Sequence, residues 1–213
     1  LEGIASCVNL EVLLCYHNKL SSIDVSKNLN LINFDCSNNS LGRIDVSKNV
    51  LLEKLLCYSC GLSTLNLVSN AALVELNCYN NSLNVLDVSN NLLLQGLYCQ
   101  ENSLTTLDLR KNILINTLNC QANPRLSSLY LEENHIIEEL FIDTPPTSII
   151  YSSYVSVKDQ IFMKYLLENF DDDRDGKLSE AESKKITAID CSNLDISSLE
   201  GIGQFVNLTS LAC

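Results

Sequence analysis

The sequence predicts a repeat solenoid of the α/β repeat class, mostly β, in which short coils stack on one another. The first observation is a cysteine that recurs at a constant interval within the frame Leu-x-x-(Leu/Phe)-x-Cys-x-x-(Asn/Cys). A fixed period of about 20 residues is the signature of a repeat architecture. The cysteines in register are Cys15, Cys36, Cys57, Cys78, Cys99 and Cys120.

The second observation is that each repeat contains a strand-like pattern twice. In the first coil, Leu10-Glu-Val-Leu-Leu-Cys15 is followed by Leu20-Ser-Ser-Ile-Asp-Val25. Alternate residues of a strand point to the same side, so each half-coil can place its apolar residues in a shared core. We therefore predict parallel strands on both faces of the solenoid, with the cysteines in its core and almost no helix.

The third observation is that asparagines recur in two columns with the same period. A carboxamide both donates and accepts hydrogen bonds, so a buried asparagine can satisfy the backbone groups of a turn. One column contains Asn18, Asn39, Asn81, Asn102 and Asn123, and the other contains Asn28, Asn49, Asn70, Asn91, Asn112 and Asn134. Cys60 replaces asparagine in the third coil of the first column.

These repeats resemble the leucine-rich repeats, specifically the 21-residue bacterial subclass with two nested half-motifs, the IRREKO type. The resemblance covers residues 10 to about 142 and implies a curved leucine-rich-repeat solenoid that binds partners. It also implies that the asparagine columns are buried ladders. One residue is inserted at Asn123-Pro-Arg-Leu126, and Ile142 replaces the cysteine of the next coil. We therefore place the end of the solenoid domain, residues 1–143, at Asp143.

The organisation of the chain changes after residue 143. Thr144-Pro-Pro-Thr147 is expected to stop the solenoid, and residues 144–158 should form an exit strand or a linker. Asp159 is a candidate N-cap for a helix with an apolar stripe, which we expect to pack against the end of the solenoid. The stripe consists of Phe162, Tyr165, Leu166 and Phe170. A cap built from this helix, a loop and a second helix is predicted for residues 159–185.

Residues 171–182, Asp-Asp-Asp-Arg-Asp-Gly-Lys-Leu-Ser-Glu-Ala-Glu, match the EF-hand calcium loop at every diagnostic position. Carboxylates stand at positions 1, 3 and 5, glycine at 6, an aliphatic residue at 8 and glutamate at 12. The alternative is a solvated acidic loop. The predicted Ca²⁺ ligands are Asp171, Asp173, Asp175, the carbonyl of Lys177, Ser179 directly or through water, and both carboxylate oxygens of Glu182. Because the loop is single, we expect a structural calcium ion rather than a sensor.

The repeat pattern restarts at Ile186, so residues 186–213 are predicted to be the first coils of a second array. The preceding cap resembles the helical, EF-hand-like cap that opens internalin-type surface proteins. The first fifteen residues realign with the last fifteen at an offset of 198, with nine identities, which indicates tandem capped arrays. Coils left open at Leu1 and Cys213 would expose strand edges, which favours head-to-tail self-association.

Composition and residue inventory exclude several classes of function. A net charge of −12 argues against nucleic acid or an anionic membrane as a partner. No apolar run approaches the ~20 residues of a membrane span, so membrane insertion is not expected within this sequence. The sequence contains neither a Gly-rich phosphate loop nor a nucleophile elbow, and its two histidines, His17 and His135, are far apart. We therefore expect no enzyme activity. Inward-pointing cysteines are expected to be free thiols rather than disulfides.

The predicted partner-binding face is the outward side of the Leu-x-x-Leu-x-Cys strands. Leucine and tyrosine lie side by side there, and tyrosine often anchors interfaces or sugar rings. The alternative is a scatter of surface aromatics without a function. The surface consists of Leu14, Tyr16, Leu56, Tyr58, Tyr79 and Tyr98. On the second face, the column Asp24, Asp45, Asp87 and Asp108 is expected to be solvated or bound to turns.

Two classes of function remain after these exclusions. The first is a secreted or cell-surface binding module that recognises a protein or a glycan, with any signal or anchor outside this sequence. The second is a calcium-stiffened spacer that binds nothing itself. An intracellular effector is disfavoured because a weak structural calcium site is useful mainly outside the cytosol.

Overall fold

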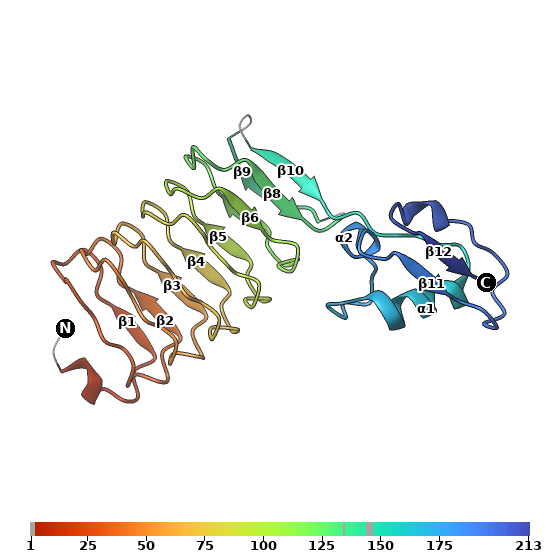
Figure 1. Cartoon of the computed structure of the whole chain (residues 1–213). Helices are drawn as coiled ribbons and strands as arrows, with labels where there is room; N and C mark the ends of the chain where they lie inside the picture. Colours follow the sequence, from red (N-terminus) through yellow and green to blue (C-terminus); the bar gives the residue numbers. More distant parts are fainter. Residues whose placement is uncertain (1–2, 134, 144–146) are drawn as a thin grey trace. The chain divides into compact units, whose positions relative to one another are not determined.

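The structure is a computed structural model that describes residues 3–133, 135–143 and 147–213. The predictions that fall on Leu1, Asn134 and Thr144–Pro146 lie outside these residues. The chain divides into two compact units, Leu1–Tyr151 and Ser152–Cys213 (Figure 1).

The first unit is a stack of coils joined by parallel strands. Its elements are η1 (Ile4–Ser6), β1 (Val12–Leu14), β2 (Asn33–Asp35), β3 (Lys54–Leu56), β4 (Glu75–Asn77), β5 (Gly96–Tyr98), β6 (Thr106–Asp108), β7 (Thr117–Asn119), β8 (Ser128–Leu131), β9 (Glu139–Phe141) and β10 (Ser148–Tyr151). Seven strands form a parallel sheet in the order β1-β2-β3-β4-β5-β7-β9. The register from β1 to β5 advances by one sequence repeat at each step, as in the pairing of Leu13 with Phe34 and of Phe34 with Leu55.

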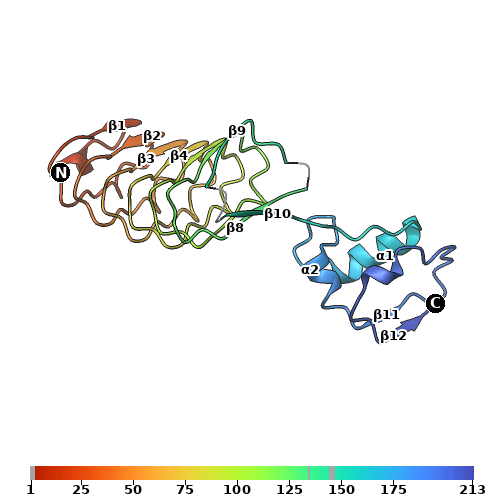
Figure 2. The ribbon, with the colours of Figure 1, turned by 90° about the horizontal axis from the view of Figure 1, so that it is seen from above.

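The second face of this unit carries a smaller parallel sheet, in the order β10-β8-β6. Figure 2 shows the strands of the large sheet along one side of the unit and β8 and β10 along the other. In the coils before β6 the second half-motif carries no assigned strand. Residues 148–151 pair with β8 as the last strand of this sheet, which is one of the two alternatives expected for this segment.

The core of the first unit consists of the repeat leucines and cysteines. Phe34, Leu55 and Leu76, the central residues of β2, β3 and β4, have no exposed surface. A fully buried leucine side chain contributes about 2 kcal/mol relative to an exposed one. The six cysteines in register are all buried, whereas Cys7 and Cys213 are exposed. The repeating pattern of the sequence is therefore the pattern of the core.

The two asparagine columns form hydrogen-bonded ladders, as predicted. Asn49 Nδ2 donates to the carbonyl oxygens of Val25 at 3.1 Å and Asn28 at 2.8 Å, and Asn70, Asn91 and Asn112 repeat this contact one coil at a time. In the other ladder, Asn39 Nδ2 donates to the Cys15 and Cys36 carbonyls, and its Oδ1 accepts from the Leu20 amide at 2.9 Å. Each amide thus ties its own coil to the preceding one.

The second unit packs a helix against two short coils. Its elements are α1 (Gln160–Phe170), α2 (Glu180–Ser183), β11 (Ala188–Asp190), η2 (Ile202–Gln204) and β12 (Ser210–Ala212). Phe162 and Leu166 of α1 are buried with Ile189, Cys191 and Phe205 from the coils. The predicted stripe therefore covers the coils of its own unit, residues 186–213. In the part of the chain that the structure describes, no helix is long and apolar enough to cross a membrane.

The first and last segments of the chain share their local structure at the offset that the sequence predicts. η1 and β1 correspond to η2 and β12, and the glycines before the two 3-10 helices have φ of 86° at Gly3 and 101° at Gly201. These left-handed values favour glycine. At Gly201 a Cβ atom would also collide with the carbonyl oxygen of Ser156.

The asparagine ladder leads to the first prediction. Replacing Asn70 with alanine removes two buried hydrogen bonds and leaves each of the two carbonyls with its backbone donor alone, so Asn70→Ala should lower the free energy of unfolding by about 2 kcal/mol. Asn90→Ala, at an exposed position of the fourth coil, should change it by about 0.5 kcal/mol or less. Urea denaturation measures both, and equal losses would contradict the ladder's role.

The cap of α1 leads to a prediction of pH dependence. Hydrogen bonds from the Ser197 hydroxyl and from the backbone amides of Phe162, Ser197 and Ile161 hold the pKa of Asp159 well below its ordinary value of 3.8. A carboxylate with a lowered pKa stabilises the fold fully above that ordinary value, and the contribution is lost as pH falls below it.

We therefore expect hydrogen exchange of the α1 amides to accelerate as pH is lowered through this range, after correction for the intrinsic rate. Asp159→Asn should accelerate exchange at neutral pH and weaken its dependence on pH. The exposed Asp195→Asn serves as the control. If the wild type and Asp159→Asn showed the same pH profile, the cap would not be the titrating group.

Candidate functional site

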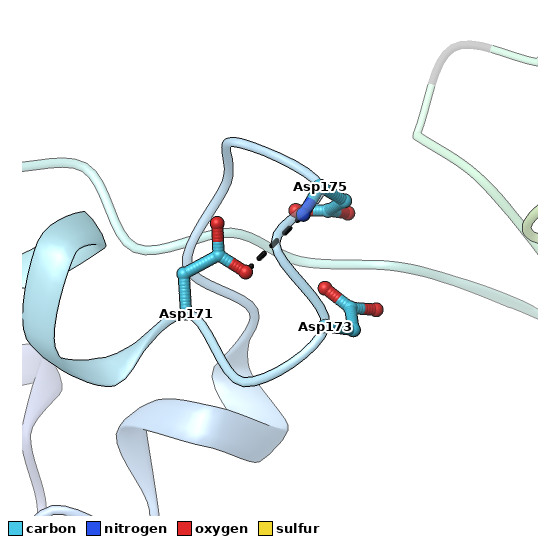
Figure 3. Close-up of side chains that lie close together, drawn as sticks. All are labelled: Asp171, Asp173 and Asp175. Carbon is cyan, nitrogen blue, oxygen red and sulfur yellow. Dashed lines mark hydrogen bonds between the residues drawn. The ribbon is translucent and has the colours of Figure 1, made fainter.

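The acidic loop lies between α1 and α2 in the second unit. Asp171 follows the last residue of α1, and Ser179 caps α2 with the reciprocal hydrogen bonds of a capping box with Glu182. Asp171, Asp173 and Asp175 each offer a carboxylate oxygen, and these oxygens all lie within 4.8 Å of one another. Figure 3 shows the three carboxyl groups around the turn of the loop. The structure thus brings together three of the six predicted calcium ligands.

Backbone amides of the loop hold two of these carboxylates in place. Asp171 accepts from the amides of Asp175 at 3.3 Å and Gly176 at 2.9 Å, and Asp175 accepts from the amide of Lys177 at 2.8 Å. Gly176 has a φ of 81°, which lets the chain reverse direction at this point. The loop conformation therefore follows from the glycine and from hydrogen bonds to the first and third aspartates.

Glu182 is placed differently from the three aspartates. Its side chain is buried, and its Oε1 accepts from the Asp172 amide at 2.8 Å. Its Oε2 accepts from both the amide and the hydroxyl of Ser179 at 2.8 Å. Both carboxylate oxygens of Glu182 and the Ser179 hydroxyl thus take part in hydrogen bonds within the loop. The side chain of Lys177 points elsewhere, with its Nζ 4.6 Å from the centroid of the Tyr154 ring.

The electrostatics of the loop favour a cation. Partial burial raises the pKa of Asp175, and the negative charges of Asp173, Asp171 and Glu182 raise it further. Carboxylates that repel one another at this range are stabilised by a positive ion between them. Oxygen ligands on a flexible loop suit a hard divalent cation such as Ca²⁺. The three-aspartate group therefore fits calcium by its chemistry.

The six residues of the predicted partner-binding face, here called the tyrosine surface, all belong to or follow strands β1 to β5. Leu14 and Tyr16 are 56% and 47% exposed, whereas Leu56, Tyr58, Tyr79 and Tyr98 are half-buried. Tyr58 and Tyr79 stack face to face, with ring centroids 4.6 Å apart and an interplanar angle of 13°. The half-burial of Tyr58 and Tyr79 follows from this stacking, because residues in register on adjacent coils lie only about 4.8 Å apart.

Strand β2 interrupts the tyrosine surface with polar residues that the sequence prediction did not select. Asn33, Asp35 and Ser37 take the positions filled by larger residues on the neighbouring coils. Asp35 is 7% exposed and Ser37 is fully buried, although both stand in outward-facing columns. The signal was present in the sequence, because these columns change from leucine and tyrosine to aspartate and serine in this one coil.

A second surface feature is a row of exposed aliphatic residues in the turns that follow the Asn28 ladder. Pairs of apolar residues after the ladder asparagine lie outside the core because the turn points away from it. The row consists of Leu29, Val50, Leu51, Leu92, Leu93, Ile113 and Leu114, each about half exposed. The sequence signal is the apolar pair that precedes the first core leucine in these coils. The described residues do not show what covers this row.

Cys57-Tyr-Ser-Cys60 has the Cys-x-x-Cys spacing of many metal and redox sites. In the structure both cysteines are fully buried, and Cys60 occupies the place of a ladder asparagine. Its thiol lies 3.2 Å from the Cys36 carbonyl oxygen, the group to which an asparagine at this position would donate. Burial raises the pKa of the Cys57 thiol. Cys57 belongs to the cysteine column of the core and Cys60 stands in the asparagine column, and these two columns are three residues apart in the repeat. The Cys-x-x-Cys spacing therefore follows from the repeat.

Comparisons with known proteins give similarity to solved structures alone. No protein-family model and no curated protein matches the chain. Among solved structures, the functional domain of InlJ from Listeria monocytogenes, which includes a cysteine ladder, is 20% identical over 99% of this chain and 59% of that one, with a TM-score of 0.34. An internalin (InlF) from Listeria monocytogenes is 18% identical over 96% and 60%, with a TM-score of 0.49. The structural neighbours are thus Listeria internalins, and this chain spans less than two thirds of either.

Proposed function

We propose that this chain is a binding module of a secreted or cell-surface protein, and that it recognises a protein or a glycan through the tyrosine surface. The observation that carries the proposal is the exposure of Leu14 and Tyr16 on the same face of the seven-stranded sheet as the stacked rings of Tyr58 and Tyr79, with the coil of β2 between them. Aromatic residues at this density are typical of interface centres. The partner-binding residues in this proposal remain Leu14, Tyr16, Leu56, Tyr58, Tyr79 and Tyr98.

We also propose that the solenoid is of the 21-residue leucine-rich-repeat subclass with an internalin-like, EF-hand-containing cap. Support for the subclass comes from the constant register of the sheet from β1 to β5, which advances by one such repeat at each strand. Support for the cap comes from the acidic loop between α1 and α2 and from the burial of α1 on the following coils. The surface location rests on this resemblance. Head-to-tail self-association through the ends near Leu1 and Cys213 stays a prediction.

The proposed cofactor is one structural Ca²⁺ in the loop of residues 171–182. Asp171, Asp173 and Asp175 would hold it from the positions they already occupy, and the carbonyl of Lys177, Ser179 and Glu182 would complete the site. When bound, the ion neutralises the repulsion between the carboxylates. Glu182 would have to exchange its present hydrogen bonds for the ion. The site therefore stabilises the loop between α1 and α2 rather than taking part in recognition.

Calcium should raise the thermal stability of the second unit. At a calcium concentration one hundred times the dissociation constant, the gain is about 2.7 kcal/mol. Thermal unfolding of the whole chain in calcium and in chelator measures it, and calorimetric titration measures binding directly. Asp171→Ala should abolish both effects, whereas Asp172→Asn, which removes a carboxylate paired with Lys185 outside the predicted ligand set, should retain calcium binding. Identical unfolding with and without calcium would reject the site.

The competing function is a spacer without a ligand, and the acidic loop supports it as much as it supports a binding module. The two differ in what the tyrosine surface does, because a spacer tolerates loss of exposed aromatics. Catalysis is not part of either proposal. Burial raises the pKa of the Cys78 and Cys120 thiols to about 12, which keeps them protonated and poor as nucleophiles.

Truncating the stacked rings should separate the two functions. Once a ligand has been found by glycan array or pull-down, the double variant Tyr58→Ala/Tyr79→Ala should weaken binding by at least about 2 kcal/mol. Tyr151→Ala, a tyrosine 52% exposed on the smaller sheet, is the matched control and should bind normally. Surface plasmon resonance gives the affinities and circular dichroism checks folding. Unchanged affinity in the folded double variant would favour the spacer.

A further inference from the structure

Strand β2 forms a sheltered polar patch inside the tyrosine surface. Asn33 and Asp35 lie on the outward side of the strand because Phe34 between them points into the core. On one side β1 aligns Val12 and Leu14 with them, and on the other side β3 aligns Lys54 and Leu56. Ser37 continues the patch between Tyr16 and Tyr58. Leucines therefore stand on both sides of the Asp35 carboxylate, and Asn33 lies between Val12 and Lys54.

Only one of the two carboxylate oxygens of Asp35 accepts hydrogen bonds from the described residues. Oδ1 accepts from the Ser37 amide at 3.0 Å and from its hydroxyl at 2.5 Å. Among the described residues, no donor contacts Oδ2, and no cation pairs with this carboxylate. The nearest basic residue in register, Lys54, is paired with Glu75 at 2.8 Å. A carboxylate this sheltered is costly without a cationic partner.

Asn33 supplies a second acceptor without a donor, since its Oδ1 is enclosed and has no hydrogen-bond partner. Most other such oxygens, including those of Asn49 and Asn70, belong to ladder asparagines with no exposed surface, which no ligand can reach. Asn33 and Gln100 differ because both residues are partly exposed, and Asn33 shares strand β2 with Asp35. A half-turn of the Asn33 carboxamide exchanges the two polar atoms and presents the oxygen outward. Because Oδ1 has no hydrogen-bond partner, this rotation breaks no hydrogen bond at that atom.

We infer that the patch receives an arginine side chain of a protein partner, an inference that rests on the proposed function and narrows it from a protein or glycan to a protein. Asn33 and Asp35 are two residues apart on one strand, so their side chains stand about 7 Å apart. The planar guanidinium has five N–H donors and can bridge both acceptors. Its faces can stack on Tyr16 or Tyr58.

The charge of the patch distinguishes arginine from the other candidate ligands. A sugar hydroxyl is uncharged, whereas one of the two acceptors here is anionic and favours a cationic donor. A lysine ammonium is a compact charge that suits Asp35 alone. The chain's net charge of −12 also favours approach of a basic partner.

The test uses N-acetyl-arginine amide as the probe in an NMR titration of the whole chain, followed through the Asn33 side-chain amide and the Asp35 carboxyl carbon. Parallel titrations use the lysine analogue, the uncharged citrulline analogue and a neutral disaccharide. We expect saturable shifts at these two residues with arginine and at least about tenfold weaker binding of citrulline, which lacks the charge. Equal binding of citrulline or lysine, or preference for the disaccharide, would overturn the inference.

Variants assign the binding to the patch. Asp35→Asn should weaken arginine binding about tenfold or more, and Asn33→Ala, which keeps the carboxylate, should weaken it several-fold. Asp45→Asn is the matched control, because Asp45 accepts from the Ser47 amide at 2.9 Å but is exposed on the other face. Unchanged binding in a folded Asp35→Asn or Asn33→Ala chain would overturn the inference.

If arginine fails to bind but a partner is still lost in Tyr58→Ala/Tyr79→Ala, only the arginine assignment is wrong. A partner that binds that double variant normally would instead reject the proposed surface. The two results are independent, because the probe contacts strand β2 and needs no identified partner.

Discussion

The fold depends on hydrogen bonds from buried asparagine amides to the backbone of the preceding coil. A stack of such short coils is mostly turn, and the carbonyls of its turns point inward where water cannot reach them. Asn49 and Asn70 each donate to two such carbonyls of the preceding coil, which also accept from the backbone amides three residues later. Because the amide has a fixed reach, it also fixes the spacing of the coils. The leucine core then packs at a register that the ladder has already set.

Regular spacing is what turns single residues into surfaces. Residues that occupy the same place in successive coils lie about 4.8 Å apart, so a tyrosine in two adjacent coils produces a stacked pair such as Tyr58 with Tyr79. A change in one coil produces the opposite result. Asp35 is sheltered because its neighbours Leu14 and Leu56 are larger, and no rearrangement of the backbone is needed. The exposed surface can therefore be altered by substitution without a change in the ladder.

Much of the fold could be predicted from the sequence, because the same pattern of leucine, cysteine and asparagine recurs in successive coils. The ladder of Asn28 and the cap at Asp159 follow from local rules of spacing and hydrogen bonding. The position of the Glu182 carboxylate could not be predicted from the loop motif, since backbone amides of the loop compete with an ion for its oxygens. The burial of Asp35 could not be predicted either, because it depends on side chains of the preceding and the following coil, each a full repeat away in the sequence.

The second unit applies the same logic to the edge of a stack. A first coil has no preceding coil to cover its core, and Phe205 and Cys191 are covered by Phe162 and Leu166 of α1. The α1 helix is in turn fixed by Asp159, whose carboxylate accepts from its own first turn and from Ser197 of the coil it covers. The acidic loop continues directly from α1 at Asp171. A cation bound there would therefore stabilise the helix that closes the core, which links a local charge balance to the stability of the whole unit.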